Sequence, residues 1–199
     1  RSFFKKLVIT ILDSRTNDLS SIPAVRHDIL NEEVCRRRYV IEKAKSKLFF
    51  CCEVRIYSEY FVDNILSTTH PCGLMVDPTA PHLCCSPDAV VMESVNNIIT
   101  YGILECKRVH AEPNATWDDL ITVREHFFLE RVNGYLRLRT DHPYFYQLVT
   151  LLSVLELDWV DICIMKGDDL HIQRFSHDQN VWLLIKQKLA SFYFKLFSF

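Results

Sequence analysis

Two carboxylates and a lysine are the residues of this chain best suited to chemistry. Asp88 precedes Glu105 by seventeen residues, and Lys107 follows two residues after Glu105. Alternate side chains of a β-strand face the same way, so on a strand Glu105 and Lys107 would project together while Cys106 turns to the opposite face. A hairpin that joins the two segments would bring Asp88 beside Glu105.

Such a pair of carboxylates would repel unless a cation lay between them. Mg²⁺ is the natural occupant because it prefers hard oxygen ligands and keeps several waters, and Mn²⁺ is a second candidate. The carbonyl of Cys106 offers a further oxygen, and Lys107 could orient or deprotonate an attacking water or stabilise charge on a phosphate. The spacing therefore indicates metal-assisted phosphodiester hydrolysis. The alternative is a surface hairpin with an ordinary salt bridge between Glu105 and Lys107.

Composition sets wider limits. The 199 residues are 49% hydrophobic and 24% charged, which is typical of a globular domain and excludes a disordered or collagen-like chain. No apolar run approaches the roughly 18–20 residues of a membrane-spanning helix, so no membrane association is expected. The chain begins with Arg1 rather than Met. We interpret residues 1–199 as one domain from a longer protein.

Eight cysteines and a net charge of −2 bear on compartment and partners. The pairs Cys51-Cys52 and Cys84-Cys85 lack the C-x-x-C spacing of a zinc site. We expect the thiols to be reduced and buried, which favours an intracellular, reducing compartment such as the nucleus or cytoplasm. The net charge does not itself indicate a nucleic-acid-binding protein, but basic residues at 36–38 and 107–108 are compatible with a local basic groove.

Hydrophobic periodicity and turn signals predict both helices and strands. Helices are expected at 22–47, within 113–140 from a start between 114 and 118, at 144–155, and at 181–196 with a packed apolar stripe. Strands are expected at 88–94 and 98–109 around a turn at 95–97, and at 159–165 and 170–175. Residues 48–62 are compatible with either state. This order predicts an α/β or α+β domain with a central mixed sheet.

Four ordered motifs resemble the YqaJ-like viral recombinase family, relatives of phage lambda exonuclease among the PD-(D/E)xK nucleases. The resemblance extends through nearly the whole chain, over the segments PAVRHDILNEEVCRRRY, GLMVDPTAPHLCCSPDAVV, GILECK and HPYFYQL. The family's acidic helix position falls on Glu32, its helix tyrosine on Tyr39, and its Tyr-x-x-Gln motif on Tyr144 and Gln147.

The resemblance implies a restriction-endonuclease-like fold, in which helices flank a mixed sheet. It also implies a Mg²⁺-dependent deoxyribonuclease, an exonuclease that acts on double-stranded DNA ends in recombination or repair. A strand-annealing recombinase is the partner that the family suggests, and some relatives assemble as homo-oligomers.

Individual residues acquire expected roles from the same resemblance. Asp88 and Glu105 would bind the metal with help from the carbonyl of Cys106. Lys107 would activate or orient water, and Gln147 would position water or a phosphate near the metal. A backbone-capping role is the alternative for Gln147.

Further roles fall outside this core. Glu32 would complete the acidic cluster, although it could instead face solvent beside Glu33. Contacts with DNA are expected from Ser86, whose alternative role is to cap a turn, from Tyr144, and from Ser2 in the N-terminal segment.

Other interpretations of the whole chain stay open. Cys84-Cys85 and Val149 depart from the family's usual residues, which motivates a catalytically inactive, nuclease-derived module for DNA binding or interaction. An endonuclease or an RNA nuclease is a further alternative, because the chemistry takes place at the phosphate. The aromatic residues at 192–199 are expected to be core or to contact sequence outside this chain.

Overall fold

A computed structural model describes residues 23–47, 53–56, 75–77, 79–95 and 98–197. The helices in this part of the chain are α2 (Pro23–Lys47), α3 (Trp117–Val123), α4 (Pro143–Leu155) and α5 (Gln179–Phe197). The strands are β1 (Glu53–Ile56), β2 (Met75–Val76), β3 (Cys84–Cys85), β4 (Ala89–Val95), β5 (Ile98–Arg108), β6 (Leu129–Val132), β7 (Tyr135–Leu138), β8 (Trp159–Lys166) and β9 (Asp169–Ser176). No helix among these residues is long and apolar enough to span a bilayer.

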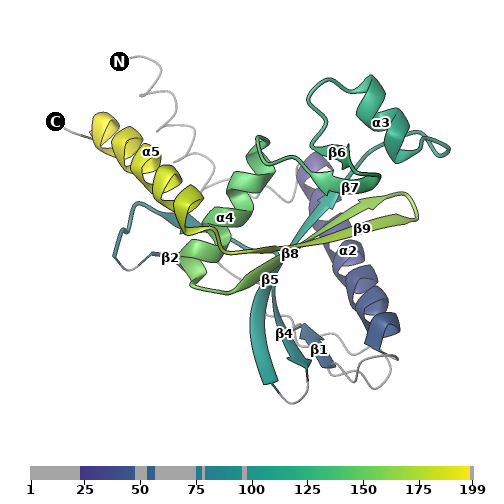
Figure 1. Cartoon of the computed structure of the whole chain (residues 1–199), viewed down its shortest axis with the longest axis horizontal. Coiled ribbons are helices and arrows are strands. Elements are labelled where there is room, and N and C mark those ends of the chain that lie inside the picture. Colours follow the sequence, from purple (N-terminus) through teal and green to yellow (C-terminus); the bar gives the residue numbers. More distant parts are fainter. Residues whose placement is uncertain (1–22, 48–52, 57–74, 78, 96–97, 198–199) are drawn as a thin grey trace.

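The centre of the fold is a five-stranded sheet in the order β1-β4-β5-β8-β9 (Figure 1). Neighbouring strands are antiparallel except for β5 and β8, which are parallel. The chain between these two strands contains α3, the small β6–β7 hairpin and α4. The mixed sheet flanked by helices confirms the predicted fold class.

Helices cover both faces of the sheet, with α2 on one face and α4 on the other (Figure 1). On β5, Leu104 and Cys106 pack in the cluster that contains Tyr39 of α2. Ile103 packs in a second cluster with Leu148 of α4. The alternation of side chains predicted for this strand is therefore confirmed.

The predicted hairpin at 88–109 is also confirmed. Strands β4 and β5 pair from Ala89 opposite Leu104 to Val95 opposite Ile98, and the turn at 96–97 lies outside the described residues. Hydrophobic side chains on both faces and β-branched residues along both strands favour this pairing.

The helix expected within 113–140 is largely wrong. Its start is confirmed, because Thr116 and Asp119 form a capping box at the N-terminus of α3. The helix ends at Val123, and the chain then forms the β6–β7 hairpin. Its turn is made by Asn133 and Gly134, with φ of 51° and 81°, and Asn-Gly favours such a left-handed turn between strands.

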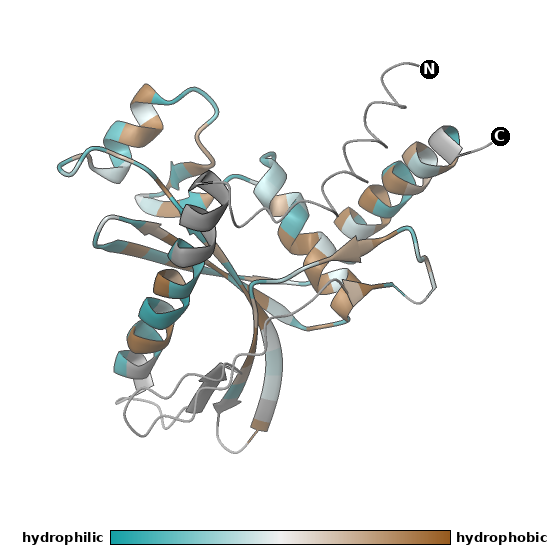
Figure 2. Cartoon of the chain, turned by 180° about the vertical axis from the view of Figure 1, so that it is seen from behind, coloured by the Kyte–Doolittle hydropathy of each residue, from teal (hydrophilic) through white to brown (hydrophobic). Residues whose placement is uncertain are grey.

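The packed stripe expected on the last helix is correct only for its first half. Trp182 is buried, whereas Leu189 and Phe192 are 37% and 58% exposed. Phe194 is 56% exposed as well, so Phe192 and Phe194 are not core, whereas the side chains of Phe197 and Phe199 lie outside the described residues. Hydrophobic residues continue along α5 where it projects from the sheet (Figure 2).

The prediction of buried cysteines holds for part of the set. Cys35, Cys106 and Cys163 are free thiols in the core, but Cys84 is exposed on β3. Cys51, Cys52 and Cys72 lie outside the described residues.

Gly102 allows a tryptophan to lie across the sheet. A Cβ atom at Gly102 would meet the Trp159 ring at 2.2 Å, and Arg174 stacks on that ring with 3.6 Å to its centroid. Gly102→Ala should therefore lower the free energy of unfolding by about 1–3 kcal/mol, the usual cost of overpacking. Urea denaturation measures this loss, which should shrink in a Trp159→Leu background. An equal loss in both backgrounds would contradict the steric explanation.

Candidate active site

The β4–β5 register brings the predicted carboxylates together. Ala89 lies opposite Leu104, so Asp88, the residue immediately before β4, is adjacent to Glu105. Asp88 Oδ2 accepts a hydrogen bond of 2.6 Å from the backbone N–H of Cys106. The side chain of Asp88 is thereby fixed beside the peptide that follows Glu105.

Glu105 is the centre of the site and is 2% exposed. Its Oε1 atom accepts hydrogen bonds from Lys107 Nζ and from Gln147 Nε2 of α4, each at 2.6 Å. Its Oε2 atom is buried and has no hydrogen-bond partner among the described residues. A buried oxygen without a partner is costly, so Oε2 is an available ligand position.

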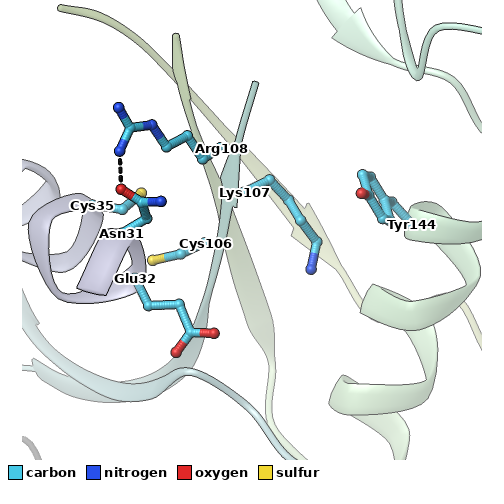
Figure 3. A pocket seen from close by; sticks show the side chains of 7 residues that line it. All are labelled: Asn31, Glu32, Cys35, Cys106, Lys107, Arg108 and Tyr144. Carbon is cyan, nitrogen blue, oxygen red and sulfur yellow. Dashed lines mark hydrogen bonds between the residues drawn. The ribbon is translucent and has the colours of Figure 1, made fainter. Parts of the chain in front are cut away.

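A pocket of about 250 Å³ opens beside these groups (Figure 3). Its wall is made by three elements: Asn31, Glu32 and Cys35 of α2, Cys106, Lys107 and Arg108 of β5, and Tyr144 of α4. Glu32 and Lys107 extend toward the same opening, and Tyr144 stands across it from α2 (Figure 3). The Lys107 ammonium lies 4.8 Å from the centroid of the Tyr144 ring.

Three further residues of the site were not predicted to be catalytic or metal-binding, although Arg36 and Arg108 belong to the basic stretches noted in the sequence. Arg36 Nη1 donates to the carbonyl of Asp88 at 3.1 Å, and Arg108 bonds to the side chain of Asn31. Both contacts connect α2 to the strands of the site. Arg108 had a signal, since it follows Lys107 directly, whereas Asn31 has none beyond its place before Glu32.

Burial and mutual repulsion raise the pKa values of the two carboxylates. Burial raises the pKa of Glu105 to about 7, and the nearby Asp88 carboxylate adds to this effect. Burial also raises the pKa of Asp88. For Lys107, burial alone would lower the pKa, but the Glu105 carboxylate outweighs it and the pKa is raised. Lys107 is therefore an ammonium at neutral pH, suited to orienting groups and stabilising negative charge rather than to removing a proton.

A Mg²⁺ ion fits this set of donors. Two adjacent carboxylates, one with a buried oxygen that lacks a partner, are what a hard divalent cation would neutralise. Among the described residues no three His, Cys, Asp or Glu side chains converge as a complete ligand set. Mg²⁺ is commonly bound by one or two carboxylates and retains water at its other positions, so the pair is sufficient.

The raised pKa of Glu105 predicts how metal-free stability depends on pH. The folded state keeps a proton that the unfolded state releases above about pH 4.5, so stability should fall as pH rises toward 7, by on the order of 3 kcal/mol. Urea denaturation in EDTA across this range measures the slope. Glu105→Gln should remove most of it. An unchanged slope in this variant would contradict the assignment.

Other predicted residues are placed as follows. Gln147 bonds to Glu105 rather than capping backbone, and Glu32 lines the pocket beside the acidic pair. Tyr144 lines the pocket too, whereas Ser86 is exposed and outside the pocket lining. Ser2 lies outside the described residues. Val149, where the family pattern has a different residue, is buried in the core.

Comparisons with known proteins give a fold match. The structure resembles crystal structures of an alkaline exonuclease (LHK-Exo) from Laribacter hongkongensis and of LHK-Exo in complex with dAMP. In each case the TM-score is 0.51, with 19% identity over 84% of this chain. The chain spans 66% and 65% of the length of those two chains. No protein-family model and no curated protein matches the sequence. The fold agrees with the resemblance to lambda-exonuclease-like proteins that the sequence motifs carry.

Proposed function

We propose that this chain is a metal-dependent deoxyribonuclease that hydrolyses phosphodiester bonds at the ends of double-stranded DNA, in recombination or repair. The observation that carries the proposal is the Asp88–Glu105 pair with Lys107 and Gln147 bonded to the same oxygen of Glu105. The exonuclease fold of LHK-Exo supports it.

Asp88 and Glu105 would hold Mg²⁺ or Mn²⁺, with the carbonyl of Cys106 as a further oxygen. When bound, the metal supplies Lewis-acid stabilisation of charge on the phosphate and lowers the pKa of a bound water. Gln147 and Lys107 hold the Glu105 carboxylate in one orientation. Catalysis depends on such fixed geometry, because groups that are already oriented need not reorganise during the reaction.

The walls of the pocket would receive the scissile phosphate. Lys107 is a half-buried cation that can stabilise the extra negative charge of the transition state. Arg108 is an exposed cation on the same wall and would contact a neighbouring phosphate. Tyr144 offers a ring and a hydroxyl at the mouth, Glu32 would complete the acidic cluster, and Ser86 and Ser2 remain predicted DNA contacts.

A comparison of linear with closed circular double-stranded DNA tests this proposal. In Mg²⁺ the linear DNA should be degraded and the circular DNA should persist, and EDTA should stop degradation. Cutting of both forms would favour an endonuclease. Binding of DNA without cutting would contradict the proposal and favour an inactive, nuclease-derived module. A strand-annealing recombinase stays a predicted partner of this chain, and homo-oligomerisation stays a predicted property.

A further inference from the structure

Three thiols from three elements lie in the same core cluster beside the proposed active site. Cys106 of β5 is the register neighbour of Cys163 of β8. Cys35 of α2 donates a hydrogen bond to the carbonyl of Cys163 at 3.4 Å. All three belong to the cluster between α2 and the sheet, and their exposed fractions are 1%, 6% and 0% for Cys35, Cys106 and Cys163.

Two of these thiols also form part of the pocket wall. Cys35 and Cys106 line the pocket, from α2 and β5 respectively, while Cys163 does not (Figure 3). A pocket of about 250 Å³ is large enough for a solute the size of water or a peroxide. Small oxidants can therefore reach this pair although their surroundings are largely apolar.

We propose that Cys35 and Cys106 form a reversible disulfide when the protein meets a peroxide. One sulfur attacks a peroxide oxygen, so that an S–O bond forms, the O–O bond breaks and one water leaves. The second sulfur then attacks this sulfenic sulfur, so that the S–S bond forms, the S–O bond breaks and a second water leaves. Two electrons and two protons pass from the thiols to hydrogen peroxide.

The bond would tie α2 to β5 at the wall of the active site. Cys35 is about one helical turn after Glu32, and Cys106 lies between Glu105 and Lys107. Contraction between the two elements would shift Glu32 and Lys107 relative to each other. This consequence rests on the proposed function. Oxidation should lower cleavage by about 100-fold, the loss that a displacement of about 1 Å in an active site can cause.

Peptide mapping tests the bond itself. The reduced protein is treated with hydrogen peroxide, free thiols are blocked with N-ethylmaleimide, and the digest is analysed by mass spectrometry with and without dithiothreitol. A dithiothreitol-sensitive peptide that links Cys35 to Cys106 is expected in the wild type and in Cys84→Ser, which removes an exposed thiol. The peptide should be absent in Cys35→Ser. A Cys35–Cys163 bond, or alkylation of both Cys35 and Cys106, would overturn the proposal.

Cleavage assays on the same samples test the consequence. Oxidised wild type and Cys84→Ser should lose activity and regain it in dithiothreitol, whereas Cys35→Ser should cleave at the same rate before and after oxidation. Formation of the bond with unchanged cleavage would overturn the regulatory role. No cleavage by the reduced wild type would refute the proposed function, while the mapped peptide would still decide whether the disulfide forms.

Discussion

Lys107→Ala should lower the rate of DNA cleavage by about 10²–10³-fold, the usual cost of removing one group that stabilises transition-state charge. Lys107 Nζ lies 2.6 Å from Glu105 Oε1 and is 19% exposed. Its loss would remove the half-buried cation of the pocket and one of the two donors that orient Glu105. Melting temperature and single-turnover cleavage of linear DNA measure folding and chemistry separately.

Lys45→Ala is the matched control for this variant. Lys45 also pairs with a glutamate, Glu42, but on the exposed surface of α2, where such a pair contributes little. Its cleavage rate should equal that of the wild type. Cleavage that survives Lys107→Ala at the rate of the control would count against catalysis in this pocket.

Asp161→Ala should destabilise the fold by about 3–5 kcal/mol, the cost of breaking a buried ion pair from one side. Asp161 is 0% exposed. It accepts from Tyr39 at 2.6 Å and from Arg174 at 2.7 and 2.9 Å, and Lys43 lies 3.0 Å away. Burial alone would raise the pKa of Asp161, but these donors keep the pKa below its ordinary value. The variant would leave the donors uncompensated between α2 and the sheet.

Asp168→Asn gives a control in the same region. Asp168 pairs with Arg38 of α2 at 3.2 Å but is fully exposed. Its replacement should change the free energy of unfolding by less than about 1 kcal/mol, as for other surface ion pairs. Similar losses in both variants, measured by urea denaturation, would show that the buried network has no special role in holding α2.

The local sequence pattern was sufficient to predict those strands and hairpins whose residues alternate regularly in hydrophobicity. The hairpin 88–109 and the strands around 166–169 have alternating or β-branched residues on either side of a polar turn. The β6–β7 hairpin was missed although Asn133-Gly134 is a turn signal, because helix-compatible spacing was extended through it. The exposed end of α5 could not be foreseen, since an apolar stripe does not reveal whether anything covers it.

The candidate site likewise contains residues whose positions follow from the local sequence pattern and residues whose positions depend on tertiary packing. Glu105 and Lys107 share a face because the strand period dictates it, and Asp88 joins them through the hairpin. The resemblance to lambda-exonuclease-like proteins singled out Gln147, but its bond to Glu105 spans 42 residues and depends on how α4 packs. Asp161 lies in the run Trp159-Val160-Asp161-Ile162, where nothing local identifies Tyr39 and Arg174 as its partners. The local sequence pattern therefore does not predict contacts between elements that are distant in the chain.

If Asp88 and Glu105 hold a catalytic metal, cleavage of DNA should depend on both the metal and these carboxylates. The most direct test follows cleavage of linear double-stranded DNA by EDTA-treated protein as Mg²⁺ is added back, with Asp88→Asn alongside. We expect no cleavage in EDTA, a rate that rises with Mg²⁺ and saturates, and a loss of about 10²-fold or more in the variant. Cleavage that persists in EDTA, or an Asp88→Asn variant as active as the wild type, would show that this pair does not hold a catalytic metal.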